Sequence, residues 1–179
     1  MSRLVAVLLA VFASALVAAA EEWEDHAEVR LIDGGVLPDG VTRLAGLEIL
    51  LDPEWKTYWR NPGDSGIPPR MDFSASDNVE SVKVEWPAPE LHFDGYGWVI
   101  GYTDGVSFPL PITPKDAADP AGRKLDLNYA GCKDICIPAE AQAEILLDGE
   151  KPRTSEVEFY RGRVPLPVEA VGEGGIVST

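Results

Sequence analysis

The chain has 179 residues, of which 15 are Lys or Arg and 30 are Asp or Glu, so its formal net charge is −15 at pH 7. This acidity argues against a nucleic-acid-binding protein and against binding to anionic membrane surfaces, because both of those partners carry negative charge. With two cysteines, two methionines and two histidines, the chain is also poor in soft metal ligands.

The first 20 residues have the pattern of a secretory signal peptide. Arg3 precedes an apolar run from Leu4 to Val17 that only Ser14 interrupts, and Ala18-Ala19-Ala20 then offers a small-residue cleavage site. The run is shorter than the ~20 residues needed to span a bilayer, and no later apolar run approaches that length. We therefore predict a signal peptide over residues 1–20, no membrane insertion after its cleavage, and export to the periplasm of a Gram-negative bacterium, where disulfides persist.

Beyond the signal peptide about 159 residues remain, enough for one domain with its own hydrophobic core. We predict this domain over residues 21–150 and an irregular C-terminal tail over residues 151–179, where the chain becomes more polar. Short apolar runs separated by Asp-Gly turn signals predict antiparallel strands. These runs lie at Glu28–Ile32, Leu44–Leu51, Val79–Trp86, Trp98–Tyr102, Ser107–Ile112, Lys124–Tyr129 and Ala141–Leu147. Their number favours an all-β fold built as a two-sheet sandwich.

Cys132 and Cys136 are the only cysteines, and they follow the strand predicted at Lys124–Tyr129. Four steps along an extended strand cover about 13 Å, whereas the Cα atoms of a disulfide lie roughly 4.4–6.8 Å apart, so residues 133–135 must bend sharply if the pair closes. A loop this short adds only about 2 kcal/mol of stability by chain entropy, against roughly 4.7 for a hundred-residue loop. The spacing therefore favours redox chemistry, and an inert structural disulfide is the alternative.

Several motifs in a fixed order resemble one protein family. They are Trp55-Lys56-Thr57-Tyr58-Trp59-Arg60-Asn61-Pro62-Gly63-Asp64-Ser65-Gly66-Ile67-Pro68-Pro69, Trp86-Pro87-Ala88-Pro89, Tyr96-Gly97, Tyr129-Ala130-Gly131-Cys132 and Cys136-Ile137-Pro138. Over about residues 25–150 the chain resembles the N-terminal periplasmic domain of the DsbD thiol:disulfide interchange protein, and more closely the ScsB-like branch of that family. The resemblance implies an immunoglobulin-like antiparallel β-sandwich.

The same resemblance implies thiol:disulfide interchange, that is, protein-disulfide reductase activity without a cofactor. The cysteine pair would relay electrons between a membrane-embedded donor and thioredoxin-fold periplasmic partners. Carried over by position, Cys136 forms mixed disulfides with partners and Cys132 resolves them. The family's membrane-spanning electron source and C-terminal thioredoxin-like domain have no counterpart in these 179 residues, so we expect the reductant to act in trans.

By the same resemblance, five side chains surround the cysteine pair: Tyr58, Phe93, Asp94, Tyr96 and Tyr129. Better-known members carry an aromatic cap just before a Tyr-Gly pair, and this chain has Gly95 at that position. Either Phe93, Tyr96 or Trp98 supplies the cap, or the pair is less shielded.

Three other functions deserve comparison with this one. Gly63-Asp64-Ser65-Gly66 resembles a serine-protease motif, but only His26 and His92 could serve Ser65 as a base, so we interpret the segment as a turn. Two thiolates could hold Cu(I), and ScsB-like proteins are associated with copper tolerance, yet Met71 is the only methionine after the signal peptide and we predict no metal site. The third alternative is a non-enzymatic immunoglobulin-like assembly module with a structural disulfide.

Overall fold

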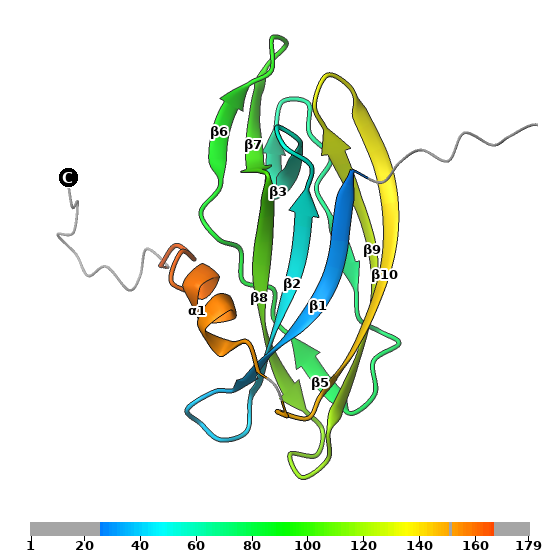
Figure 1. Cartoon of the computed structure of the whole chain (residues 1–179), viewed down its shortest axis with the longest axis vertical. Coiled ribbons are helices and arrows are strands. Elements are labelled where there is room, and N and C mark those ends of the chain that lie inside the picture. The colour runs from blue at the N-terminus through cyan, green and yellow to red at the C-terminus, as the bar shows by residue number, and fades with distance from the viewer. Residues whose placement is uncertain (1–25, 151, 167–179) are drawn as a thin grey trace, which may run out of the picture.

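Two antiparallel sheets face each other in the computed structural model, which describes residues 26–150 and 152–166 (Figure 1). The first sheet has the order β1 (Ala27–Val36), β2 (Arg43–Leu51), β8 (Gly105–Pro114) and β5 (Val79–Val82). The second has the order β10 (Cys136–Leu147), β9 (Ala121–Cys132), β3 (Lys56–Gly63), β7 (Trp98–Thr103) and β6 (Glu90–Phe93), with β4 (Arg70–Asp72) paired to β9. This is an immunoglobulin-like antiparallel β-sandwich, and the predicted fold class is confirmed.

The core lies between the sheets because inward-facing residues alternate with solvent-facing ones along the strands. On β9 the side chains of Leu125, Leu127 and Tyr129 are buried, while those of the intervening residues are exposed. Phe108 of β8 lies at the centre of the core, with its ring edge-on to Trp86 at 4.9 Å and to Tyr102 at 5.5 Å between centroids. Aromatic pairs at these distances and angles add to the stability that burial provides.

All seven predicted strands are present, but the structure has three more, β3, β4 and β6. β4 and β6 span only three and four residues, too few for a periodic pattern, and β3 ends in the turn-like sequence Asn61-Pro62-Gly63. The strand predicted at Val79–Trp86 ends at Val82. Past that point the backbone amides of Lys83 and Glu85 still donate hydrogen bonds to the carbonyls of Pro111 and Pro109. Those prolines have no N–H to donate in return, so the regular hydrogen-bond pattern of two paired strands cannot form.

The expectation of an irregular C-terminal tail is wrong for residues 154–161, which form helix α1 (Thr154–Arg161) on the outer face of β1, β2 and β8. Val157 is fully buried against Ile32 and Leu44. At the other end of the helix, Arg161 forms an ion pair with Glu85 at 3.1 Å. One buried apolar residue in a charged segment gives almost no helical pattern in the sequence, so tertiary packing decides this helix. Residues 151 and 167–179 of the predicted tail lie outside the described residues.

The predicted signal peptide also lies outside the described residues. Among the residues that are described, no helix is long and apolar enough to cross a membrane.

Val157→Ala is expected to lower the free energy of unfolding by about 2 kcal/mol, because it removes two buried methyl groups and leaves a cavity under α1. Urea unfolding of the mature protein measures this loss. Val41→Ala is the matched control, because Val41 is exposed in the turn between β1 and β2, and its effect should stay within about 0.5 kcal/mol. Equal effects of the two substitutions would contradict the packing of α1 on the sheet.

Candidate functional site

The β9–β10 hairpin brings Cys132 and Cys136 together. The two residues are direct partners in the antiparallel register, and the turn of residues 133–135 closes the hairpin between them. Their Cα atoms lie 4.1 Å apart, and a disulfide joins them. Cys132 is 7% exposed, whereas Cys136 is exposed. The hairpin therefore leaves Cys136 exposed and keeps Cys132 against the protein interior.

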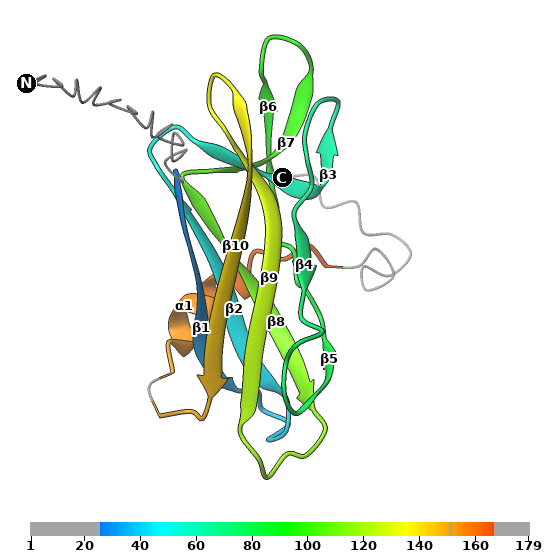
Figure 2. The ribbon, with the colours of Figure 1, turned by 90° about the vertical axis from the view of Figure 1, so that its right-hand side faces the viewer.

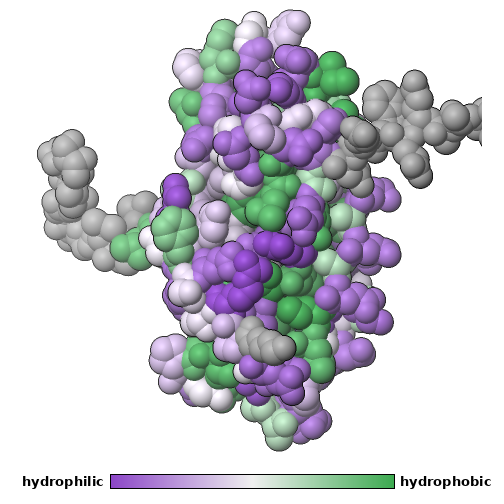
Figure 3. All heavy atoms as spheres, viewed as in Figure 1, coloured by the Kyte–Doolittle hydropathy of each residue, from purple (hydrophilic) through white to green (hydrophobic). Residues whose placement is uncertain are grey.

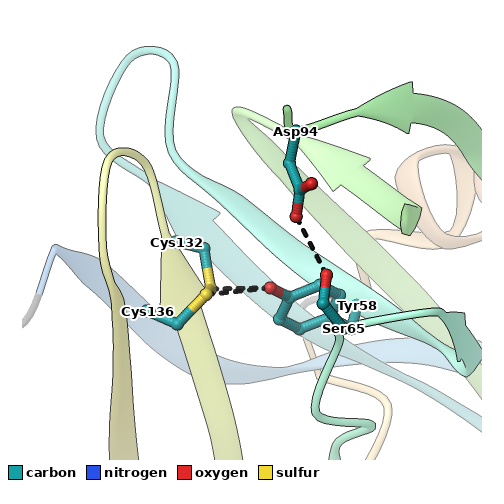
Figure 4. The surroundings of a disulfide bond; sticks show 5 residues. All are labelled: Tyr58, Ser65, Asp94, Cys132 and Cys136. Carbon is teal, nitrogen blue, oxygen red and sulfur yellow. Dashed lines mark hydrogen bonds between the residues drawn. A yellow bond between two sulfur atoms is a disulfide. The ribbon is translucent and has the colours of Figure 1, made fainter. Parts of the chain in front are cut away.

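Tyr58 is the side chain in direct contact with both sulfurs, as Figure 4 shows. Its hydroxyl oxygen lies 2.8 Å from Sγ of Cys132 and 3.0 Å from Sγ of Cys136. The side chain is 4% exposed and forms a small buried cluster with Cys132, Val99 and Ala130. Burial, reinforced by the negative charge of Asp94, raises the pKa of Tyr58. The phenol therefore keeps its proton at neutral pH.

The Gly63-Asp64-Ser65-Gly66 segment connects Tyr58 to the tip of the β6–β7 hairpin. A Cβ on Gly66 would lie 2.5 Å from Cδ1 of Tyr58, so only glycine allows the loop to pack this closely on the ring. The Ser65 hydroxyl donates a hydrogen bond to the Asp94 carboxylate at 2.9 Å, and the Trp98 amide donates a hydrogen bond to the Asp64 carboxylate at 2.8 Å. We name residues 63–66 the clasp, since they fix the hairpin tip relative to Tyr58.

The residues of the clasp that resemble a protease motif have a structural role. The Ser65 hydroxyl is engaged by Asp94, as Figure 4 shows. His26 is hydrogen-bonded to Asp52 at 2.9 Å, and His92 is hydrogen-bonded to Glu90 at 3.1 Å. Neither imidazole is therefore paired with Ser65, and the interpretation of this segment as a turn agrees with the structure.

The tip of the β6–β7 hairpin is built around Asp94. Its Oδ1 accepts hydrogen bonds from the amides of Tyr96 and Gly97, both at 2.9 Å, and Gly95 adopts φ +94°, a conformation that favours glycine. These two amides, together with the Ser65 hydroxyl, lower the pKa of Asp94. Asp94 is therefore ionised at neutral pH and contributes negative charge close to Tyr58.

The aromatic side chains of this tip are exposed to solvent. Phe93, Tyr96 and Trp98 are 62%, 97% and 53% exposed, and Phe93 packs edge-on against Trp98 at 5.4 Å. Tyr58 forms a hydrogen bond to each of the two sulfurs. None of the three candidate caps is buried, and Cys136 is exposed, so the choice between a capped and a less shielded pair stays a prediction.

Of the five side chains expected around the cysteines, the structure brings Tyr58 to the sulfurs and links Asp94 to it through the clasp. Phe93 and Tyr96 lie on the exposed hairpin tip. Tyr129 is buried in the main core, and it also lines a small pocket with Gly131 and Ile137, the residues next to the two cysteines. The sequence analysis gave no role at the cysteines to three further neighbours, Ser65, Val99 and Ala130, because side-chain contacts between strands and loops leave no periodic pattern in the sequence.

Charged side chains also border the turn of residues 133–135. Lys133 forms an ion pair with Glu54 at 2.7 Å, and the hydrogen bond from Lys133 lowers the pKa of Glu54. The described residues contain no group of three or more His, Cys, Asp or Glu side chains arranged to hold a metal ion. Met71 packs against the main core.

Asp94→Ala is expected to destabilise the folded protein at neutral pH and to lose that effect in acid. Because the folded-state pKa of Asp94 is lowered, its ionised form stabilises the fold at pH values above the unfolded pKa of about 4, and this stabilisation is lost as the pH falls through the folded pKa. Urea midpoints of the wild type and the variant should therefore differ at about pH 7 and converge towards about pH 2.

Glu80→Ala serves as the control for this pH dependence, because the Glu80 side chain makes no hydrogen bond or ion pair in the described part of the chain. Its urea midpoint should follow that of the wild type at every pH. A difference between wild type and Asp94→Ala that is the same at every pH would contradict the role given to the ionised carboxylate.

Comparisons with known proteins agree with this geometry. The family model described as "Thiol:disulfide interchange protein DsbD, N-terminal" matches residues 36–148. The crystal structure of the N-terminal periplasmic domain of ScsB from Proteus mirabilis superimposes with a TM-score of 0.65 at 26% sequence identity. The aligned region covers 79% of this chain and 56% of the ScsB chain, so this chain spans little more than half the length of that structure. A search of curated proteins found no match.

Proposed function

The chain belongs to the family of DsbD N-terminal thiol:disulfide interchange domains, and from this premise we propose that it relays electrons through the Cys132/Cys136 pair to or from thioredoxin-fold proteins. The observation that carries the proposal is the asymmetry of the disulfide. Cys136 is exposed at a hairpin tip, while Cys132 is buried behind it against Tyr58. Cys136 can therefore contact a partner protein, while Cys132 stays close enough to Cys136 to form the intramolecular disulfide.

This asymmetry assigns the two cysteines different roles in the proposed exchange. In the reduced domain, the Cys136 thiolate attacks a partner disulfide and forms a mixed disulfide, which releases one partner thiolate. Cys132 then attacks Cys136, re-forms the intramolecular disulfide and releases the second partner thiol. Two electrons pass to the partner in each cycle. In the reverse direction, the same steps reduce the Cys132–Cys136 disulfide with electrons from a reduced donor.

The end of the molecule that carries Cys136 supplies the surface for a partner. The β6–β7 and β9–β10 tips project from the same end of the sandwich in both views (Figures 1 and 2). Figure 3 shows hydrophobic groups at this end among hydrophilic ones. The exposed apolar side chains on the two tips are Phe93, Tyr96, Trp98 and Ile135. Exposed aromatic residues clustered beside a reactive group are typical of protein-binding surfaces.

We propose that the protein works in the periplasm after removal of residues 1–20, with a membrane-embedded electron donor that acts in trans. The ScsB neighbour is itself a periplasmic domain, which supports the compartment. Mass spectrometry of the protein exported from a Gram-negative host tests the cleavage, and a mature N-terminus at Glu21 is the expected result.

The reduction potential of the Cys132–Cys136 pair tests the function directly. Equilibration of the mature protein in glutathione buffers, followed by trapping of free thiols, should give a value between about −180 and −270 mV, the range of exchange proteins. A value below about −300 mV would instead indicate a structural bond and would support the assembly-module alternative.

A further inference from the structure

The buried position of Cys132 creates a chemical requirement for the second step of exchange. To resolve a mixed disulfide, Cys132 must react as a thiolate, because the thiol is a poor nucleophile. Yet Cys132 is 7% exposed, and Val99 and Ala130 in its cluster are apolar. Burial in such surroundings disfavours a sulfur anion unless a hydrogen-bond donor meets it.

Tyr58 is the group placed to meet this requirement. Its hydroxyl lies 2.8 Å from Sγ of Cys132, on the buried side of the disulfide, and the other members of the cluster offer no polar side chain. We propose that Tyr58 is a catalytic residue that donates a hydrogen bond to the Cys132 thiolate while Cys136 is held in the mixed disulfide. This inference rests on the proposed function and assigns a residue to its resolving step.

The step balances without any further reactant. Cys132 loses its proton to solvent, and its thiolate attacks Sγ of Cys136. The Cys132–Cys136 bond forms as the bond between Cys136 and the partner sulfur breaks. The partner sulfur leaves as a thiolate and takes up a proton from solvent, so the domain's dithiol is oxidised by two electrons and the partner disulfide is reduced. Tyr58 keeps its proton throughout and only donates a hydrogen bond.

The surroundings of Tyr58 fit a permanent donor rather than a base. Its raised pKa keeps the phenol protonated at neutral pH, and Gly66 packs directly on its ring and limits its movement. Opposite Tyr58 in the β3–β7 register is Gly101, where a Cβ would lie 2.1 Å from the Thr57 carbonyl oxygen, so the two strand backbones approach closely at Tyr58. The close strand pairing fixes the backbone of Tyr58, and the Gly66 contact fixes its ring, so the hydroxyl is held at the sulfurs.

The charges near the site come from several elements and act on wild type and variant alike. Asp94 lies on the β6–β7 tip, and Lys56 of β3 is the register partner of Cys132. Lys133 and Asp134 lie in the turn of the β9–β10 hairpin, where Lys133 is paired with Glu54. A substitution at Tyr58 that keeps the ring leaves all of these charges in place.

Tyr58→Phe tests the proposal because it removes the hydroxyl and keeps the ring. The reduced mature protein is mixed with dithiobis-nitrobenzoate in a stopped-flow instrument: attack by Cys136 releases the first nitrothiobenzoate, and resolution by Cys132 releases the second. We expect the second phase to slow by about ten- to a hundredfold at neutral pH, the effect of one hydrogen bond to a charged group. The first phase should slow less, because Cys136 is exposed to water, although the same hydroxyl lies 3.0 Å from its Sγ. The difference should shrink as the pH rises, since Cys132 then ionises without help.

Tyr102→Phe is the matched control. Tyr102 is also a buried tyrosine, but its hydroxyl donates to the Pro87 carbonyl at 2.9 Å, away from the sulfurs. This variant should show both phases at wild-type rates. A second phase at the wild-type rate in Tyr58→Phe, or equal slowing in both variants, would overturn the role of Tyr58.

Results that contradict thiol:disulfide exchange differ from results that contradict only the role of Tyr58. A wild-type protein that releases no second nitrothiobenzoate, or a pair with a potential below about −300 mV, would contradict exchange itself. Normal wild-type phases together with an unaffected Tyr58→Phe variant would contradict only the inference about Tyr58.

Discussion

Cys132→Ser is expected to arrest exchange at a stable mixed disulfide, whereas Cys136→Ser is expected to reduce exchange to the background rate. The difference follows from exposure: Cys136 can reach a partner sulfur from its hairpin tip, while Cys132 is buried behind it and can reach only Cys136. A serine hydroxyl remains protonated at neutral pH and cannot replace the attacking thiolate. With Cys132 replaced, nothing resolves the covalent intermediate.

Non-reducing electrophoresis with a thioredoxin-fold protein as the probe measures both outcomes. Cys132→Ser should accumulate a covalent complex that dithiothreitol separates by reducing its disulfide, and Cys136→Ser should form almost no such complex. Because neither variant can form the intramolecular disulfide, each controls for the loss of that bond in the other. Accumulation of the complex with Cys136→Ser instead would reverse the assigned roles, and equal behaviour of the two variants would contradict the asymmetry.

Phe108→Ala is expected to lower the free energy of unfolding by about 3–5 kcal/mol, the largest stability loss that we predict for a single substitution. Phe108 is fully buried on β8, the strand next to β2 in the middle of its sheet, and its ring contacts Trp86 and Tyr102. Truncation leaves a cavity that the surrounding aromatic rings cannot fill without leaving their positions. The melting temperature should fall by roughly 6–20 °C, because each kcal/mol corresponds to about 2–4 °C for a chain of this size.

Phe159→Ala is the matched control for the core. Phe159 is 60% exposed on α1 and packs edge-on only with its neighbour Tyr160 and below the Arg163 guanidinium. Its truncation should cost less than about 1 kcal/mol in urea unfolding. A loss for Phe108→Ala as small as that for Phe159→Ala would show that the two sheets do not pack around Phe108.

The local sequence predicted the elements whose signals are repeated and short in range. Alternation along Lys124–Tyr129 predicted the strand and its buried face, because a period of two places every second side chain on the same side. The bend between Cys132 and Cys136 followed from the length of an extended chain against the reach of a disulfide. Where prolines interrupt pairing, as at Pro109 and Pro111, the same approach overestimated the length of a strand.

The motif resemblance identified the family before the structure, but it did not give the contacts of the site. It placed Tyr129 around the cysteines, but it did not show that this side chain is buried in the main core. It gave no role to the clasp, whose Gly63-Asp64-Ser65-Gly66 sequence resembled a protease motif. Contacts between side chains on different strands depend on register and loop shape, and a motif in one segment contains neither.

The sequence by itself therefore determined that this protein is an antiparallel sandwich with two closely spaced cysteines at a strand end, because turn residues and alternation act over a few positions. Only the tertiary structure decided that Tyr58 contacts the sulfurs of two cysteines 74 and 78 residues away, that the clasp joins Tyr58 to Asp94, and that α1 covers the outer face of a sheet. Each of these contacts depends on how the strands of the two sheets pair and on which surfaces the packed sandwich leaves to be covered. No single segment of the chain contains that information.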